Sequence, residues 1–541
     1  MNDHDYHHSH EVDPPHHGEP RPGHPRTVGL WIEMSDASLA DGHGEGLIRW
    51  TRALVGGLDA LADVKGIVIP CQPGSQRIMA ALFADDASGD PPRLVSPKLQ
   101  IVSAGHSRRL VDDVQRWVDR KRRHALDRLA AIGVSTKPSS WLHALLRLTQ
   151  ESPSSLGLLI MMLGRSWKML VAALVLGLTS IARPLIHRLR SPFEALAREM
   201  ARRGGVDLWI VPNPGWSAAT ALPGPMIVNV ADIVYREFPL PDLRPDEIEQ
   251  HGTSLRRLAE RAESVVCFSR HVADRQVRPS LEGVARRIAV VPHAPFRTRP
   301  CRLPQEASRM RLAADLRGHF SKPKPHRYFC DFPFESVDYL VVSSKCRPYK
   351  NYAAILHAYE DILRRHRRDL KLMVTGHLSG NPDLAAILHL RGLVFDVVEA
   401  TNLPEDVHTR LIQHARCLVI PTLFEGALPF GFAEAVSLGT PVAMARIPVV
   451  EEVLTADDLA ATEYFRPGDV AAMTRSILHV LDKPGAVLDR QQRIVAGLEQ
   501  RTWADVAADY LALTTSVPVA TGSLQPALRR RNALDQAVAG T

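Results

Sequence analysis

Two carboxylates nine residues apart, Glu425 and Glu434, are well suited to accept hydrogen bonds from hydroxyl groups of a polar ligand. They bracket a loop between the apolar run Cys417–Ile420 and a short helical pattern, which Gly439 should end in a left-handed cap. This order brings backbone N–H groups and a helix N-terminus to the carboxyl edge of a sheet, where a diphosphate is favoured. The stretch predicts a site for hydroxyl and phosphate groups. The alternative is that Glu425 caps the helix and Glu434 is a solvated helical residue.

A second loop carries three basic side chains, Lys345, Arg347 and Lys350, between an apolar run and an amphipathic helical pattern. Cations held in place stabilise the negative charge that builds on a departing phosphate, an effect of several kcal/mol in enzymes. A solvated basic loop is the other interpretation. Beside the loop of Glu425, phosphate binding is favoured.

Alternating apolar runs and helical patterns must position these loops, and this alternation is typical of parallel α/β sheets. In the first half we expect strands at 27–32, 66–70, 99–103, 208–211, 226–230, 264–268 and 288–291, with helices such as 46–62 and 255–262 between them. In the second half we expect strands at 339–343, 371–375, 394–399, 417–420 and 441–444. Two doubly wound domains of this kind place a ligand cleft at the carboxyl ends of their strands.

Composition divides the rest of the chain. Residues 1–26 are rich in His and Pro and have too few apolar residues to offset the entropy lost on ordering, so a disordered tail is favoured over a metal-binding role for these histidines. Residues 516–541 are predicted to form a second disordered tail. The domains expected between them are 27–296, a Pro-, Arg- and Lys-rich linker without a period at 297–336, and 337–484, followed by terminal helices at 485–515.

The composition, the cysteine count and the net charge restrict the class of protein. A hydrophobic content of 45% and a charged content of 23% are ordinary for a soluble globular protein. The six cysteines show no CxxC pair, which argues against a zinc site or a disulfide framework and favours the reducing cytoplasm. The net charge of +7 allows nucleotide diphosphates, anionic lipids or nucleic acid as partners, and charge alone does not choose among them.

An insert at 106–203 interrupts the alternation with long, basic, helix-like sequence. Its centre, 156–182, is almost wholly apolar but is broken by Arg165 and Lys168. A membrane span needs roughly 20 apolar residues, and burying two cations in the bilayer is costly. Docking at the membrane interface is favoured, because Arg and Lys side chains can reach the headgroups while the apolar face is buried. Buried helices and a true span remain as alternatives.

The stretch 417–445 resembles the donor-binding signature of family-4 retaining glycosyltransferases of the GT-B fold, in which two glutamates bracket a loop and a Gly-Thr-Pro-Val turn follows. Lys350 with Asn351 matches the lysine of the family's basic loop. The resemblance covers about 27–104 and 205–515. This sequence departs from the pattern at two places: the glutamates are usually eight apart, and Ala231 precedes Asp232 where many members have His-Asp.

The resemblance implies a role for each candidate residue. Glu425 would contact the sugar hydroxyls beside the reacting carbon, and Glu434 would hold the ribose. Lys350 and an arginine would neutralise the donor diphosphate. Arg347 is favoured as this arginine, and Lys345 is the alternative in its place. The remaining donor-binding positions are Gly426, Leu428, Pro429, Phe430 and the turn at Gly376; the first domain contributes the phosphate loop Gly44, Glu45 and Gly46 and the acceptor-side Asp232. Turns at His271 and His293 would support the core, and the last helix, starting at Trp503, would cross back onto the first domain.

The fold implied is α/β, GT-B, with two Rossmann-like domains facing a central cleft and a helical insert in the first. The activity implied is retaining transfer of a hexose from a UDP- or GDP-sugar to a glycan or lipid-linked acceptor of the cell envelope, at the cytoplasmic membrane face. Arg347 and Lys350 would replace a metal, and neither a cofactor nor nucleic acid is expected besides the nucleotide-sugar co-substrate. Two alternatives remain: a sugar-nucleotide epimerase of the same fold, and an inactive membrane-docked scaffold.

Overall fold

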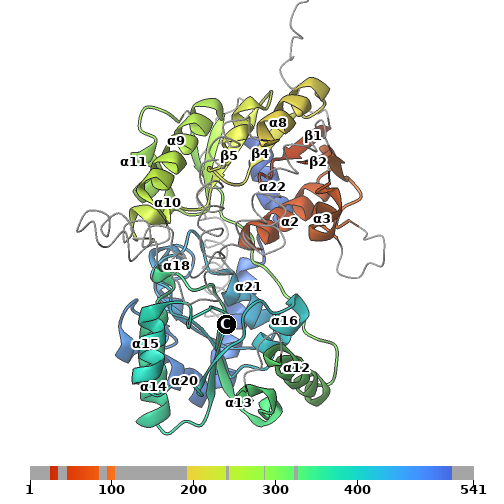
Figure 1. Cartoon of the computed structure of the whole chain (residues 1–541). Helices are drawn as coiled ribbons and strands as arrows, with labels where there is room; N and C mark the ends of the chain where they lie inside the picture. Colours follow the sequence, from red (N-terminus) through yellow and green to blue (C-terminus); the bar gives the residue numbers. More distant parts are fainter. Residues whose placement is uncertain are drawn as a thin grey trace, which may run out of the picture. The chain divides into compact units, whose positions relative to one another are not determined.

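The computed structural model describes residues 25–34, 45–72, 74–84, 94–103, 192–238, 240, 243–285, 287–321 and 327–514. The chain divides into two compact units, and the larger (Met1–Ile69, Ile78–Ile101 and Gly205–Thr541) contains both sheets except the last two residues of the strands Val64–Cys71 and Leu99–Ser103. Figure 1 shows the whole chain. Most of the expected insert, including its apolar centre at 156–182, lies outside the described residues, as do both expected tails apart from Pro25 and Arg26. No described helix is both long enough and apolar enough to span a membrane.

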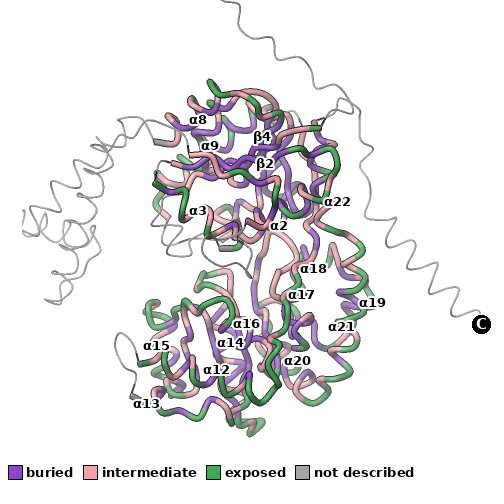
Figure 2. Tube along the Cα trace, turned by 90° about the vertical axis from the view of Figure 1, so that its right-hand side faces the viewer, coloured by how far each residue is buried: buried purple, intermediate pink, exposed green. Residues whose placement is uncertain are grey.

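The first sheet has seven strands in the order β3-β2-β1-β4-β5-β6-β7. Their bounds are β1 Arg26–Leu30, β2 Val64–Cys71, β3 Leu99–Ser103, β4 Leu208–Val211, β5 Met226–Val230, β6 Ser264–Cys267 and β7 Ile288–Val290. The paired strands from β2 to β7 run parallel. Continuous apolar strands such as β4 and β5 are buried on both faces, as a parallel sheet covered by helices requires (Figure 2). The expected seven strands are thus confirmed, with ends that differ by two residues at most.

The helices described before residue 300 are α2 Glu45–Asp59, α3 Gln76–Leu82, α8 Pro192–Arg203, α9 Pro245–Arg261, α10 Arg270–Val272 and α11 Arg278–Ser280, with a π-helical turn at Ala273–Val277. Helix α9 begins ten residues before the expected start at Leu255. Pro245 occupies its first turn, and the side chain of Glu247 accepts a hydrogen bond from the backbone N–H of Arg244 at 3.0 Å. The first half of α9 is polar, so hydrophobic periodicity gives no sign of it.

The second sheet has six parallel strands in the order β10-β9-β8-β11-β12-β13. Their bounds are β8 Tyr339–Val342, β9 Lys371–Val374, β10 Val397–Glu399, β11 Cys417–Ile420, β12 Val442–Ala445 and β13 Tyr464–Phe465. Strand β13 was not expected, because two residues are too few to form a pattern. Strands β8 and β11 are adjacent and parallel although they are not consecutive in sequence. The loops that follow them therefore start side by side at the carboxyl edge of the sheet.

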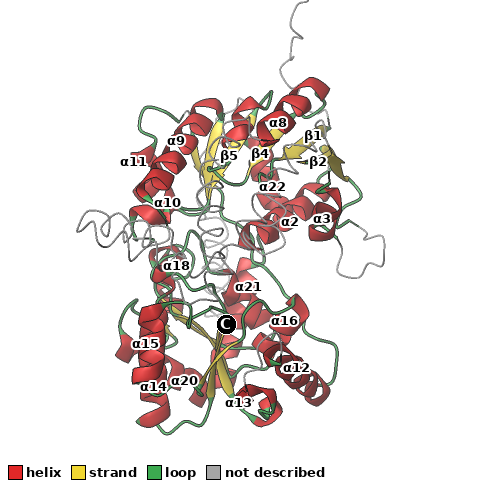
Figure 3. Ribbon diagram, in the orientation of Figure 1, coloured by secondary structure: helices red, strands yellow, loops and turns green. Residues whose placement is uncertain are grey.

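Helices surround this sheet (Figure 3). They are α12 Gln305–Phe320, α13 Arg327–Cys330, α14 Tyr352–Arg364, α15 Pro382–Leu390, α16 Glu405–Gln413, α17 Phe430–Ser437, α18 Pro448–Glu451, α19 Ala456–Leu459, α20 Val470–Asp482 and α21 Pro484–Leu498. Helix α17 ends at Ser437, and Gly439, two residues later, has the left-handed φ of 84° expected of the residue that caps it.

The segment 297–336, predicted as a linker without a period, contains a helix, because α12 occupies 16 of its residues. Leu312 and Leu316 of α12 are buried in the same core as Phe334 and Tyr339. The apolar residues of α12 do not gather in one stripe, and this explains why no helical period is visible in the sequence.

The last described helix, α22 Trp503–Ala512, packs against α2 of the first sheet (Figure 1). The Tyr510 hydroxyl donates to Asn229 Oδ1 of β5 at 2.9 Å, and Arg26 of β1 donates to Thr514 Oγ1 at 2.9 Å. The chain therefore returns to its first sheet after completing the second.

Candidate functional site

The loops after β8 and β11 are joined by hydrogen bonds. The carbonyl of Tyr349 accepts from Leu423 N at 2.7 Å and from Thr422 Oγ1 at 3.1 Å. Asn351, in the left-handed conformation at φ 57°, donates from its side chain to the carbonyl of Pro421 at 3.2 Å. The adjacent strands thus hold the two loops that the sequence singled out in one fixed arrangement.

Lys350 and Glu425 contact each other directly across these loops. Each side chain keeps about a fifth of its surface exposed, so both can still reach a ligand. The ammonium of Lys350 also lies 5.3 Å from the centre of the Tyr349 ring, a favourable cation–π distance. Lys345 and Arg347 are exposed on the same loop.

Glu434 lies on α17, and only 7% of its side chain is exposed. Its Oε1 contacts the guanidinium of Arg49, which belongs to α2 and also lies 5.4 Å from the centre of the Phe296 ring. Arg49 is not among the site residues predicted from the sequence. Its one signal is its position, one turn into the helix that follows the glycine-rich loop.

Gly426 is pressed against the first sheet's loop after β5. A Cβ atom on Gly426 would lie 2.2 Å from the carbonyl oxygen of Ala231, and the Gly426 carbonyl accepts from Ser269 Oγ at 2.9 Å. A glycine is needed here because the backbone approaches Ala231. Contact of Gly426 with the donor, which the resemblance implies, remains a prediction.

Asp232 follows Ala231 and completes a group of charges with Glu425 and Lys350. Burial raises the pKa of the Asp232 carboxyl; the backbone N–H of Val234, 3.2 Å from Oδ1, opposes this rise, and the charge of Glu425 adds to it. The position predicted on the acceptor side therefore holds a carboxyl that resists ionisation.

His293 lies among aromatic rings beside the start of α17. Its ring centre is 4.8 Å from that of Phe430 and 5.8 Å from that of Phe268, and Nδ1 is 2.9 Å from the carbonyl of Ala294. Burial lowers the pKa of His293 from 6.5 to about 4, so the ring is neutral at pH 7. These contacts agree with the supporting role expected for this turn.

Gly376 is also fixed by packing. A Cβ there would lie 2.7 Å from the hydroxyl of Tyr352, which donates to the carbonyl of Ser344 at 2.6 Å. The turn after β9 thus lies against the start of the basic loop, as the predicted donor site requires.

Of the other predicted positions, some lie beside the two glutamates and one is outside the described residues. Leu428 is half-buried, Pro429 precedes α17, and Phe430 is its first residue, so they adjoin Glu425 and Glu434. Gly44 lies outside the described residues, while Glu45 and Gly46 begin α2, the helix that carries Arg49. Among the described residues, no group of three or more His, Cys, Asp or Glu is placed to hold a metal ion.

This arrangement can bind hydroxyl and phosphate groups together. Two carboxylates accept hydrogen bonds from hydroxyls, and the cations of the basic loop attract phosphate oxygens.

Part of the chain matches a known family. Residues 337–483 match the model of glycosyl transferases group 1. This match covers the second sheet and both loops, and it confirms the resemblance at the level of this family.

Solved structures show the same fold over most of the chain. HepE of Anabaena, in complex with UDP and glucose, is 10% identical, with a TM-score of 0.50 over 91% of this chain and 100% of HepE. Sucrose-phosphate synthase of Thermosynechococcus elongatus is 12% identical, with a TM-score of 0.50 over 90% of this chain and 98% of the synthase. The fold is GT-B, as expected: two Rossmann-like parallel sheets.

A further solved structure is similar over a smaller part of the chain. TarM of S. aureus is 10% identical, and the match covers 57% of this chain and 55% of TarM, with a TM-score of 0.42. No curated protein sequence matches this chain. The assignment to family 4 and the roles of single residues remain predictions.

Proposed function

We propose that this protein is a retaining glycosyltransferase that moves a hexose from a UDP- or GDP-linked sugar to a glycan or lipid-linked acceptor. The proposal rests on the direct contact between Lys350 and Glu425, because it brings a phosphate-binding cation and a hydroxyl-binding carboxylate together within the group 1 segment.

In this proposal Lys350 and Arg347 neutralise the leaving diphosphate, and Glu425 accepts hydrogen bonds from the sugar hydroxyls. The acceptor hydroxyl attacks the anomeric carbon from the face that the diphosphate leaves. The bond from this carbon to the phosphate oxygen breaks, the new glycosidic bond forms, and a diphosphate oxygen takes the proton. These steps need no metal and no organic cofactor.

Donor binding here is an exchange of partners. Lys350 already contacts Glu425, and Arg49 already contacts Glu434. Sugar and ribose hydroxyls would take the places of these two cations at the carboxylates. The two cations would then lie beside the donor's phosphates and neutralise their negative charge.

The test is a screen of the purified full chain against UDP- and GDP-sugars, with release of the nucleoside diphosphate as the readout. We expect one donor to be turned over, slowly without acceptor, and Lys350→Met and Glu425→Gln to reduce the turnover at least tenfold. Arg302→Ala, an exposed arginine near the start of α12, serves as the control. Absence of both binding and turnover would refute the transferase proposal. A converted sugar nucleotide without diphosphate release would show an epimerase instead.

We also propose that 156–182 docks the enzyme on the inner face of the cytoplasmic membrane. The basic flanks of this segment would add attraction to anionic lipids, about 1 kcal/mol for each charge near the surface. Deleting 156–182 should move the protein from the membrane fraction to the supernatant. Equal partitioning of both forms would contradict the docking role.

A further inference from the structure

A cavity of about 590 Å³ lies at the carboxyl ends of β12 and β13. Its lining residues are Arg446, Glu451, Thr462, Tyr464, Phe465, Arg466, Pro467, Ala472, Arg475 and Ser476. None of them belongs to the loops that carry Lys350 and Glu425. The cavity is therefore separate from the donor site proposed above, and it is large enough for a sugar-sized ligand.

Three arginines meet at this cavity from three elements. Arg446 follows β12, Arg466 follows β13, and Arg475 lies on α20; all three are exposed. The lining has one acidic residue, Glu451, whose carboxylate lies 3.3 Å from Arg446. The side chains of Arg466 and Arg475 make no ion pair or hydrogen bond with any residue that the structure describes. The cavity thus carries an excess of positive charge.

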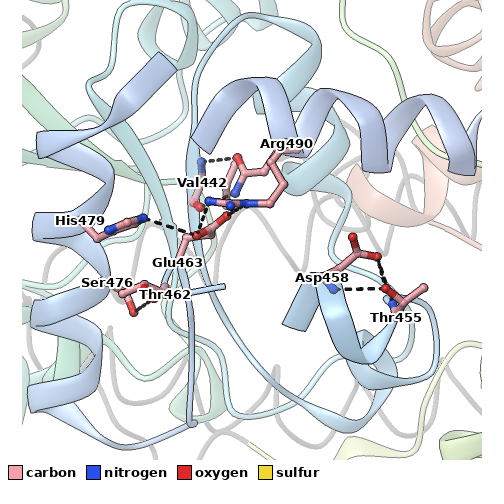
Figure 4. A network of polar contacts seen from close by, with 9 residues as sticks. Val442, Thr455, Asp458, Thr462, Glu463, Ser476, His479 and Arg490 are labelled. Carbon is pink, nitrogen blue, oxygen red and sulfur yellow. Dashed lines mark hydrogen bonds and ion pairs between the residues drawn. The ribbon is translucent and has the colours of Figure 1, made fainter. Parts of the chain in front are cut away.

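Two buried acids in this part of the second domain have other partners. Glu463, which is fully buried just before β13, is bound by Arg490 at 2.7 and 3.2 Å and lies 3.9 Å from His479 (Figure 4). The carboxylate of Asp458 accepts from the Thr455 hydroxyl at 2.6 Å (Figure 4). Both acids are therefore engaged by partners outside the lining.

The floor of the cavity is held firmly. The Ser476 hydroxyl donates to the carbonyl of Thr462, which ties α20 to the segment entering β13 (Figure 4). Tyr464 and Phe465 are both buried in the core of the second sheet. The backbone that carries Arg466 and Arg475 is therefore held in place before a ligand binds.

We propose that this cavity binds a phosphate group attached to a sugar-sized molecule. Arginine guanidinium groups match phosphate oxygens with paired, charge-assisted hydrogen bonds, and a phosphate can accept from more than one arginine. The half-buried ring of Pro467 gives the carrier molecule an apolar surface to contact. The phosphate can come from a soluble sugar phosphate or from the phosphorylated headgroup of a membrane lipid, and the chemistry of recognition is the same for both.

Two probes distinguish the sources. Glucose 6-phosphate, with glucose as its uncharged counterpart, tests the soluble ligand by calorimetry. Vesicles of phosphatidylglycerol, with phosphatidylcholine for comparison, test the headgroup by co-sedimentation. We expect one of the phosphate probes to bind the full chain, and the double variant Arg466→Ala/Arg475→Ala to bind it at least about tenfold more weakly.

The matched control is Arg493→Ala, an exposed arginine on α21 outside the lining, which should bind like the unmodified chain. UDP binding and the melting temperature should stay unchanged in the double variant, because neither arginine contacts the proposed donor loops. Binding of both phosphate probes at full strength by the double variant would overturn the proposal, and so would the failure of both probes to bind. If the full chain turns over no donor but still binds a phosphate probe, the proposed transferase activity is contradicted and the proposed phosphate site is not.

Discussion

The guanidinium of Arg49 on α2 contacts the buried carboxylate of Glu434 on α17, so a helix of the first sheet supplies the counter-ion of a residue predicted to hold the donor. Breaking a buried ion pair costs about 3 kcal/mol or more, because the remaining charge has no partner. Arg49 is 32% exposed, which reduces this cost through solvent screening.

We therefore expect Arg49→Ala to lower the melting temperature by several degrees, a loss on the order of 1–2 kcal/mol. The double variant Arg49→Ala/Glu434→Gln should recover part of the loss, because the amide carries no charge. Calorimetry of the unmodified chain, the two single variants and the double variant gives the coupling free energy between Arg49 and Glu434. Additive effects would show that the contact contributes nothing to stability.

His293 makes stability depend on pH. The pKa of this ring is lowered by burial from 6.5 to about 4, so the unfolded chain binds a proton in a range where the folded chain does not. The folded state therefore loses stability as the pH falls from about 7 towards 4, by up to about 3 kcal/mol in total. Below the lowered pKa both states are protonated, and this contribution stays lost.

Urea denaturation at pH 7.5 and pH 5 measures the effect. We expect the midpoint to fall at pH 5 in the unmodified chain and to fall less in His293→Gln, which does not titrate. The variant has its own fixed cost from altered packing, so the comparison concerns the slope with pH. Equal slopes in both proteins would contradict the assignment to His293.

The sequence predicted best where one residue pattern decides the structure. Strands such as Leu208–Val211 and Cys417–Ile420 are short apolar runs buried on both faces, so their bounds can be read directly. The adjacency of Lys350 and Glu425 follows from the sheet order that the alternation implies. Arg49 could not be found in this way, because its partner Glu434 is distant in sequence and only the packing of α2 brings them together.

Helix α12 shows a second limit of sequence patterns. Its apolar residues are spread around the helix and form no single stripe, yet Leu316 is fully buried. We expect Leu316→Ala to destabilise the chain by about 2–5 kcal/mol, as truncation of a core leucine does. Met310→Ala on the same helix is the control, since Met310 is 49% exposed and should matter little. Equal stability of the two variants would show that α12 is an exposed connection.

Gly426 offers the sharpest test of how the loop of Glu425 is held. An added Cβ would meet the carbonyl oxygen of Ala231 at 2.2 Å, and a backbone atom cannot move aside as a flexible side chain does. Gly426→Ala should therefore displace the loop and Glu425 with it, lowering both the melting temperature and the affinity for a nucleotide sugar. Gly431→Ala makes the same chemical change five residues later, where the Cβ would lie 3.4 Å from a Leu418 side-chain carbon. Since that contact is ordinary and alanine favours helices, the second variant should keep both stability and affinity. If Gly426→Ala matched Gly431→Ala in both measurements, the close approach to Ala231 would have no role in holding Glu425.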